Sequence, residues 1–259
     1  MPSTNIVYVC SPDWSDQLIV SMYSLLKSGT TFDKIIVYCV GSPPPSWIFV
    51  DPRVEIRERE SRPEAEILVE GKFYVNKAYL CLSESDRTVF LDADTIIRKP
   101  IDSIWRRSDS DVIARLTARV FEPTWSASLW NDVQKKVGGR EGYPYFNSGC
   151  LVFQNGAHRK LEKTWPDLIS SLGRGIPVFA NALHEKGTRL TEQLALSLAM
   201  GVHNLSYSLM SPNDHTYLWC GEDYANSIVL HTSGPRFLGF IRSMGLSVDL
   251  ASSAILKRA

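Results

Sequence analysis

The stretch VFLDADTII, residues 89–97, decides the fold of this chain. Residues 89–91 form a short continuous apolar run, which is typical of a strand covered on both faces of a parallel sheet. Asp92 and Asp94 follow at its carboxyl end, where open α/β sheets place their ligands. Residues two apart on an extended backbone point the same way, so both carboxylates face one point. Because like charges repel, a divalent cation with oxygen ligands, magnesium or manganese, would stabilise this pair.

The segments on either side support a site at this position. Residues 77–82 are apolar at helical spacing, and the polar residues 83–87 predict a turn before the strand. Downstream, Pro100 ends the extended segment, and Asp102 or Ser103 is expected to cap a short helix. An isolated Asp-x-Asp is more often a solvated turn than a site. Here the ordered unit of helix, turn, strand and proline favours the functional interpretation.

Residues 77–105 resemble the metal-binding core of GT-A nucleotide-sugar glycosyltransferases, and within them glycosyltransferase family 8, the glycogenin and bacterial galactosyltransferase group. Three features carry the resemblance: a lysine at the start of the helix, a strand that closes with Asp-x-Asp, and a following Lys-Pro-Ile-Asp. It implies an α/β GT-A fold, a Rossmann-like, doubly wound and mostly parallel sheet flanked by helices. We expect a single domain over residues 1–259, with a nucleotide-binding part (1–110), a donor-sugar and acceptor part (111–236) and a C-terminal tail (237–259).

Composition excludes several classes of protein. The chain has 259 residues, 44% hydrophobic and 22% charged, which suits a globular α/β protein of one domain or two smaller ones. Its 28 basic and 28 acidic residues cancel, so no broad field attracts nucleic acid or an anionic membrane. Neither a leader of basic and apolar regions nor a run of about 18 apolar residues is present, and we expect a cytoplasmic location.

The cysteines are odd in number, widely spaced and set mostly in apolar runs. They predict reduced core thiols, because no Cys-x-x-Cys pair indicates a structural zinc or a redox dithiol. They are Cys10, Cys39, Cys81, Cys150 and Cys220.

The first forty residues predict the start of a doubly wound sheet: a strand over 5–10, a helix over 17–27 and a strand over 34–40. The loop after the first strand would lie beside the two aspartates. The resemblance implies that Cys10 and Ser11 hold the uracil and ribose, while Trp14 is either a stacking surface or a lid over the core. The loop carries no glycine-rich phosphate motif, which counts against a dinucleotide oxidoreductase or a P-loop enzyme.

The middle of the chain is less regular. Residues 51–71 alternate in charge, which predicts an exposed edge strand or a solvated loop. Residues 112–114 predict a short strand. The aromatic residues that follow are expected to serve either as platforms for sugar rings near the acceptor or as core. They are Phe121, Trp125, Trp130, Tyr143 and Tyr145.

A second family mark is Phe146-Asn147-Ser148-Gly149, interpreted as a turn that leads into a buried strand. Gly149 permits close backbone approach, and Asn147 offers a donor and an acceptor to sugar hydroxyls. Residues 191–198 predict a capped amphipathic helix, with Thr191 as a candidate cap. The family has an Asp-Gln pair at the donor sugar near this helix start, whereas this chain has Glu192 and Gln193. For Glu192, a first-turn residue that supports the helix dipole is the alternative.

Residues 227–236 predict a strand that ends in a histidine followed by a glycine turn. In the resembling family a His-x-x-Gly element supplies the third metal ligand and contacts the diphosphate, which implies His231 as ligand and Gly234 at the phosphates. The family's lysine and Pro-Trp are missing beyond it, and Arg236 stands nearby. The other histidines, among them His158, His184, His203 and His215, have no such context and stay unassigned.

The leading functional hypothesis is a metal-dependent glycosyltransferase that moves a hexose from a nucleoside diphosphate sugar, UDP foremost, to a hydroxyl of a glycan, glycolipid or protein. Asp92, Asp94 and His231 would hold manganese or magnesium. Lys77, with Arg236 as a further candidate, would add positive charge to the leaving diphosphate. The donor-binding set also includes Ala93, Asn147, Ser148 and Gly149. The catalytic set is Asp92, Asp94, Glu192 and Gln193.

Several alternatives stay open. Family analogy implies that the anomeric configuration is retained, by displacement on the same face of the sugar. A covalent intermediate with Glu192 as the nucleophile is the weaker hypothesis. A sugar-1-phosphate nucleotidyltransferase shares the sheet and the carboxylates but begins with a glycine-rich basic loop. A non-catalytic nucleotide-sugar binding module is the third candidate. The tail after Phe237 is either a short helix packed on the domain or an amphipathic end that touches a partner or membrane surface. The sugar, the acceptor and the oligomeric state are not determined.

Overall fold

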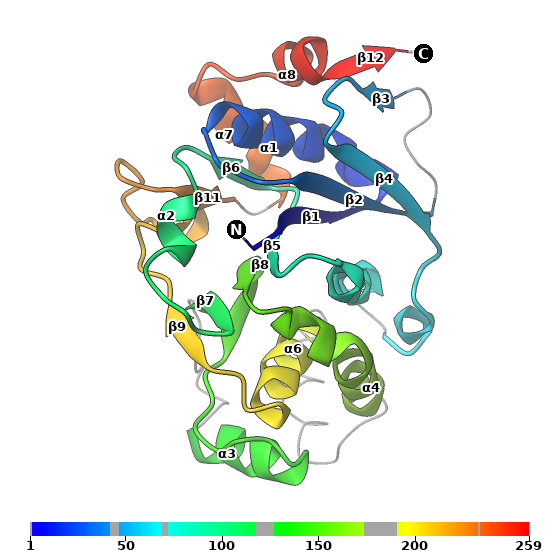
Figure 1. Ribbon diagram of the computed structural model, residues 1–259, viewed down its shortest axis with the longest axis vertical. Coiled ribbons are helices and arrows are strands. Elements are labelled where there is room, and N and C mark those ends of the chain that lie inside the picture. The colour runs from blue at the N-terminus through cyan, green and yellow to red at the C-terminus, as the bar shows by residue number, and fades with distance from the viewer. Residues whose placement is uncertain are drawn as a thin grey trace.

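A seven-stranded sheet crosses the centre of the computed structural model, in the order β4-β2-β1-β5-β8-β7-β9 (Figure 1). The structure describes residues 2–41, 47–68, 72–117, 127–173, 191–232 and 234–258. The strands of this sheet are β1 (Thr4–Cys10), β2 (Lys34–Val40), β4 (Val54–Arg59), β5 (Arg87–Leu91), β7 (Val112–Leu116), β8 (Phe146–Phe153) and β9 (Tyr207–Leu209).

The central strands are mostly apolar and almost entirely buried, because helices cover both faces of the sheet. Along β1, Ile6 and Tyr8 point into one core, and Val7 and Val9 point into the other. The first core is closed by α1 (Ser15–Lys27), α7 (Gly234–Ser243) and α8 (Val248–Ile255). The second core is closed by η3 (Lys72–Leu82), α4 (Leu161–Gly173) and α6 (Thr191–Val202).

The strand order creates a topological switch point between β1 and β5. β1 pairs in parallel with β2 on one side and with β5 on the other, and β2 pairs in parallel with β4. Antiparallel β8 then joins β5 to β7, and β7 pairs in parallel with β9. The chain thus winds outward from β1 and returns to β5, and ligands of such sheets bind beyond the carboxyl ends of these two strands. This confirms the predicted mostly parallel, doubly wound sheet.

A smaller sheet of three strands, in the order β10-β11-β6, lies beside that switch point (Figure 1). β6 (Thr95–Ile97) begins directly after Asp94 and pairs antiparallel with β11 (Val229–His231). β11 pairs in parallel with β10 (His215–Tyr217). Because His231 is opposite Thr95 in this register, the pairing brings the histidine next to the Asp92–Asp94 turn.

The C-terminal tail packs on the domain, as one of the two interpretations predicted. α8 packs against α1, with Ala251 and Ile255 buried in the core. β12 (Leu256–Arg258) then pairs antiparallel with β3 (Trp47–Phe49). The interpretation of residues 237–258 as a loose end is therefore wrong. Within the described ranges, no helix combines the length and the apolar composition that crossing a membrane requires.

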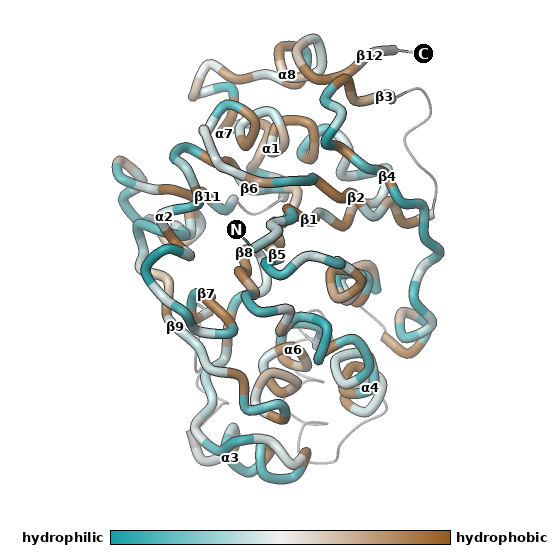
Figure 2. Tube along the Cα trace, in the orientation of Figure 1, coloured by the Kyte–Doolittle hydropathy of each residue, from teal (hydrophilic) through white to brown (hydrophobic). Residues whose placement is uncertain are grey.

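Most local predictions are confirmed, including α1, β2 and the edge position of β4. Figure 2 shows the underlying pattern: hydrophobic residues along β2 and β8, and hydrophilic ones at the end of β4 and in the segment after it. The remaining described elements are η1 (Pro12–Trp14), η2 (Pro63–Glu66), α2 (Asp102–Trp105), α3 (Ala127–Lys136), η4 (Ala157–Lys160) and η6 (Leu218–Cys220).

Four local predictions are wrong in detail. Lys77 lies in the middle of η3 rather than at the start of a helix, and the Phe-Asn-Ser-Gly stretch is the beginning of β8 rather than a turn. α6 is buried on all sides except at its last residue, so it is not amphipathic. Asp102 does not cap α2, because its carboxylate accepts from the Thr31 amide and the Arg106 side chain instead.

The cysteine prediction holds for four of the five positions. Cys10, Cys39, Cys81 and Cys150 are buried, whereas Cys220 is exposed at the end of η6. Burial raises the pKa of Cys39 to about 11, so this thiol stays protonated at neutral pH.

Candidate active site

The two aspartates lie in the short turn that connects β5 to β6. The amide and the hydroxyl of Thr95 donate to the Asp92 carbonyl at 3.2 and 2.7 Å. The Asp92 amide donates to the Gly149 carbonyl at 2.9 Å, and both the amide and the hydroxyl of Thr232 donate to the Asp94 carbonyl. The backbone of the turn is therefore held by β6, β8 and the end of β11, which leaves both carboxylates to other partners.

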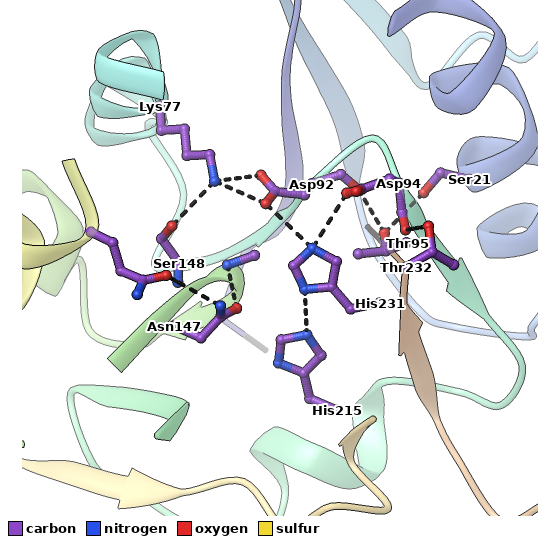
Figure 3. A network of polar contacts seen from close by, with 12 residues as sticks. Ser21, Lys77, Asp92, Asp94, Thr95, Asn147, Ser148, His215, His231 and Thr232 are labelled. Atoms are coloured by element: carbon purple, nitrogen blue, oxygen red, sulfur yellow. Dashed lines mark hydrogen bonds and ion pairs between the residues drawn. The ribbon is translucent and has the colours of Figure 1, made fainter. Parts of the chain in front are cut away.

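His231 completes a cluster with these carboxylates (Figure 3). Its Nε2 lies 3.3 Å from an Asp94 oxygen and 3.7 Å from an Asp92 oxygen. The three ligand atoms all lie within 4.8 Å of one another. Two carboxylates and one imidazole are a donor set that manganese and magnesium accept, so these residues fit the predicted cation.

A buried chain of hydroxyl groups supports the turn from the α1 side. The Tyr8 hydroxyl lies 3.1 Å from Ser21 Oγ, which lies 3.1 Å from Thr95 Oγ1. Thr95 in turn donates to the Asp92 carbonyl. The helix α1 and the strand β1 thus contribute to holding Asp92 in place, which the sequence did not indicate.

Lys77 reaches Asp92 from the other side. Its buried Nζ lies 2.8 Å from each oxygen of the Asp92 carboxylate and 3.1 Å from Ser148 Oγ (Figure 3). Burial lowers the pKa of Lys77, but the charges of Asp92 and Glu192 more than offset this, and the net pKa is raised. Lys77 is therefore a permanent cation beside one of the two aspartates, in agreement with its predicted place near the site.

Glu192 faces the same group of polar atoms from the first turn of α6. One of its carboxylate oxygens accepts from Ser148 Oγ at 3.2 Å. The other is buried and has no hydrogen-bond partner among the described residues. Burial raises the pKa of Glu192 to about 7, with Lys77 and the Ser148 hydrogen bond opposing and Asp92 adding to the rise. Near neutral pH this carboxyl can both donate and accept a proton.

Gln193 has a different environment from Glu192, because both its side-chain oxygen and its side-chain nitrogen form hydrogen bonds within the protein. Its oxygen accepts from Asn147 Nδ2 at 3.2 Å and from the Ser148 amide at 3.1 Å. Its nitrogen donates to the Tyr145 hydroxyl at 3.0 Å. Gln193 therefore fastens α6 to the start of β8 and positions Asn147 and Ser148.

Of the residues predicted to contact the nucleotide, the structure brings only some near the two aspartates. Cys10 is the last residue of β1 and Ser11 follows it, and the buried thiol of Cys10 donates to the Ser11 carbonyl. Trp14 is half-buried and packs on the core, which agrees with its interpretation as a lid. Arg236 is exposed in the first turn of α7, which begins at Gly234, and no contact in the described part of the chain joins it to the aspartates.

The aromatic residues after β7 are core rather than platforms where the structure describes them. Trp130, Tyr143 and Tyr145 are buried, and both the indole of Trp130 and the amide of Gln134 donate to the Tyr143 carbonyl. Phe121, Trp125 and His184 lie outside the described residues.

The residue that sequence reasoning missed is His215. It is fully buried on β10, and its Nε2 lies 3.1 Å from Nδ1 of His231. Burial lowers the pKa of His215 well below its usual value, and His231 and Arg115 lower it further. No motif marked it, because only the pairing of β10 with β11 brings it to the site.

Together the sheet order and the site at its switch point define a doubly wound class of α/β protein. No family model matches the sequence, and no curated relative is found. Solved structures identify the particular fold as the GT-A fold, which confirms the family resemblance at the level of structure.

Three similar structures are glycosyltransferases. An active-site mutant of LgtC matches at a TM-score of 0.65, with 12% identity over 98% of this chain and 97% of that one. The galactosyltransferase LgtC in complex with donor and acceptor sugar analogues matches at 0.58, with 13% identity over 96% and 94%. The apo bifunctional glycosyltransferase WbbM matches at 0.55, with 12% identity over 89% of this chain and 45% of that one.

Proposed function

We propose that this chain is a divalent-metal-dependent glycosyltransferase that moves a hexose from a nucleoside diphosphate sugar, foremost a UDP-sugar, to an acceptor hydroxyl with retention of configuration. The observation that carries the proposal is the convergence of Asp92, Asp94 and His231 beyond the carboxyl end of β5. The GT-A fold supports it, because the three similar structures described above are glycosyltransferases.

Each residue of the site has a chemical role in this proposal. A cation bound by the two aspartates and His231 would supply positive charge to the diphosphate leaving group. Lys77 lies 2.8 Å from Asp92 and orients that carboxylate while adding a second positive charge. Asn147 and Glu192 lie on the β8 and α6 side, where their polar atoms would orient the hydroxyls of the donor sugar.

Glu192 and Gln193 have different roles in this proposal. The free oxygen of Glu192 can accept from, or donate to, a bound hydroxyl, because its pKa is about 7. The Gln193 side chain already makes three hydrogen bonds, so its role is to hold Asn147 and Ser148 in place. If the Glu192→Gln variant keeps its full transfer activity, Glu192 is excluded as a covalent nucleophile.

The test is a thermal-shift panel of UDP-, GDP-, CMP- and dTDP-sugars, each with manganese, with magnesium and with chelator. We expect one nucleotide family to raise the melting temperature only when metal is present. Asp94→Asn should abolish that shift, whereas Asp109→Asn, at an exposed position, should leave it unchanged. A shift with a nucleoside triphosphate and a sugar-1-phosphate would instead indicate a nucleotidyltransferase, and no metal-dependent shift would indicate a binding module.

A product assay separates transfer from binding. With the donor found in the panel, we expect metal-dependent release of the nucleoside diphosphate and transfer of the sugar to an added oligosaccharide or glycolipid. The anomeric configuration of the new bond, determined by NMR, then tests retention. Binding of the donor without any turnover, by transfer or by hydrolysis, would contradict the enzymatic proposal.

A further inference from the structure

The two histidines of the small sheet are joined by a single hydrogen bond between their rings. His215 Nε2 and His231 Nδ1 are 3.1 Å apart, and the two rings stack at 5.2 Å with an interplanar angle of 13°. His215 lies on the side of His231 that faces away from the two aspartates (Figure 3). The Nδ1 of His215 is buried, and nothing in the described part of the chain forms a hydrogen bond with it.

This bond can hold only one proton, and its position decides what the other nitrogen of His231 can do. A neutral imidazole has one N–H and one lone pair. If the shared proton belongs to His231, the lone pair on its Nε2 faces Asp92 and Asp94. If it belongs to His215, the proton of His231 is on Nε2 instead and faces the carboxylates. Only the first arrangement allows Nε2 to bind a cation.

The surroundings keep the His215 ring in place. Its backbone carbonyl accepts from the Arg115 guanidinium, which is also paired with Glu222. The Glu222 carboxylate accepts from the Tyr217 amide at 2.7 Å, and the Tyr217 ring meets the His215 ring edge-to-face at 4.9 Å. The ring is thus confined between His231 and Tyr217, so the nitrogen that His231 meets is determined by the fold.

We propose that His215 is a positioning residue that accepts the Nδ1 proton of His231 and thereby turns the lone pair of His231 Nε2 toward Asp92 and Asp94. The inference rests on the metal site of the proposed function and deepens it. In this arrangement His215 acts on the metal site through the tautomer of His231, and not through a contact of its own with Asp92 or Asp94 (Figure 3).

Two substitutions at this position separate proton acceptance from packing. His215→Gln places an amide oxygen near the former Nε2 and keeps an acceptor, but it loses the stacked ring. His215→Phe keeps a ring of similar shape and loses the acceptor. The probe is manganese alone, titrated by calorimetry into the metal-free protein without any sugar or nucleotide. We expect a loss of affinity of about 10- to 100-fold for the Phe variant and near wild-type affinity for the Gln variant.

The opposite ranking, with the Phe variant near wild type and the Gln variant impaired, would overturn the proposal in favour of ring packing. If both variants lose affinity, the protonated nitrogen of each histidine ring is determined directly in the wild-type protein by nitrogen-15 NMR. Magnesium is used for this measurement because it is diamagnetic. We expect a protonated Nδ1 on His231 in the magnesium-bound state, with His215 protonated on Nδ1 only. A protonated Nε2 on His231 in that state would refute the proposal.

The outcomes also distinguish this inference from the proposed function. Binding of manganese to the wild type and its loss in Asp94→Asn would support the metal site, whatever the result at His215. An unchanged affinity in both His215 variants would then refute only the positioning role. Absence of manganese binding in the wild type would refute the metal site and this inference together.

Discussion

The ring of His231 fills the space that a side chain would need at Gly149. A Cβ atom at this glycine would lie 2.0 Å from Cε1 of His231 and 2.5 Å from its Nδ1. The glycine in β8 is therefore required by close approach of the ring, and no unusual backbone angle is involved. The Phe-Asn-Ser-Gly element and the C-terminal histidine, which are far apart in the sequence, are parts of one contact.

We expect Gly149→Ala to displace the His231 ring and to lower manganese affinity by at least about tenfold, because the ring has to move to relieve the overlap. Overpacking of this kind also destabilises proteins by about 1–3 kcal/mol. Calorimetric titration with manganese and urea unfolding measure the two effects.

The control for this substitution is Gly239→Ala in α7, where a Cβ meets no atom within 4 Å. We expect unchanged manganese affinity and a gain in stability of up to about 1 kcal/mol. Equal manganese affinity in the Gly149 variant and the wild type would show that the ring can shift without loss of the site.

Removal of the cation beside Asp92 should be costly when no metal is present. Lys77→Met removes the buried ammonium group that pairs with the half-buried Asp92 carboxylate, and we expect a loss of about 3 kcal/mol in the free energy of unfolding. Urea unfolding with chelator measures it. The matched control is Lys34→Met, which breaks an exposed ion pair with Glu55 and should cost at most about 1 kcal/mol. Similar losses in the two variants would contradict the importance of Lys77 for the site.

The raised pKa of Glu192 predicts a pH dependence of stability in the metal-free protein. The folded-state pKa is about 7 and the ordinary value is 4.5, so the folded state binds the proton more tightly. The resulting stabilisation is complete below pH 4.5 and is lost as the pH rises through 7. Because glutamine does not titrate, Glu192→Gln should gain about 3 kcal/mol relative to the wild type across this range.

Chemical unfolding at a series of pH values, with chelator present, tests this expectation. Glu84→Gln, at an exposed carboxyl, is the control and should follow the wild-type curve. A constant difference in the free energy of unfolding between the Glu192 variant and the wild type would show that the carboxyl has the same pKa in the folded protein as in the unfolded chain.

The buried His158 predicts a pH dependence of the opposite sign at acid pH. His158 is buried and its Nε2 donates to the Ser83 carbonyl at 2.7 Å, while burial lowers its pKa from 6.5 to about 4. The unfolded chain therefore binds the proton more readily, and stability is complete above pH 6.5 and falls as the pH decreases through 4. The difference over this range is about 3 kcal/mol.

His158→Gln removes this titration while its amide can still donate to the Ser83 carbonyl. We expect the free energy of unfolding of the variant to decrease less than that of the wild type as the medium is acidified. Parallel curves for the two proteins would mean that His158 accepts a proton in the folded state as easily as in the unfolded chain.

Sequence alone determined the parts of this protein that depend on neighbouring residues. The apolar runs predicted β1, β2 and β5, because strands buried on both faces carry no polar alternation. Periodicity predicted α1, and the Asp92–Asp94 spacing predicted a carboxylate pair at the end of β5. The family resemblance added Lys77, Gly149 and His231, which the structure brings together around that pair.

Only the tertiary structure decided how these pieces meet. The antiparallel register of β6 and β11 places His231 beside Asp94, and the parallel pairing of β10 then adds His215, which no local pattern marked. The burial of α6 up to its last residue was likewise not predictable from local pattern, because it results from packing between α4 and β8 rather than from the helix's own sequence. Local pattern reports which face of an element is apolar, whereas contacts between distant segments depend on strand register and on the packing of the whole core.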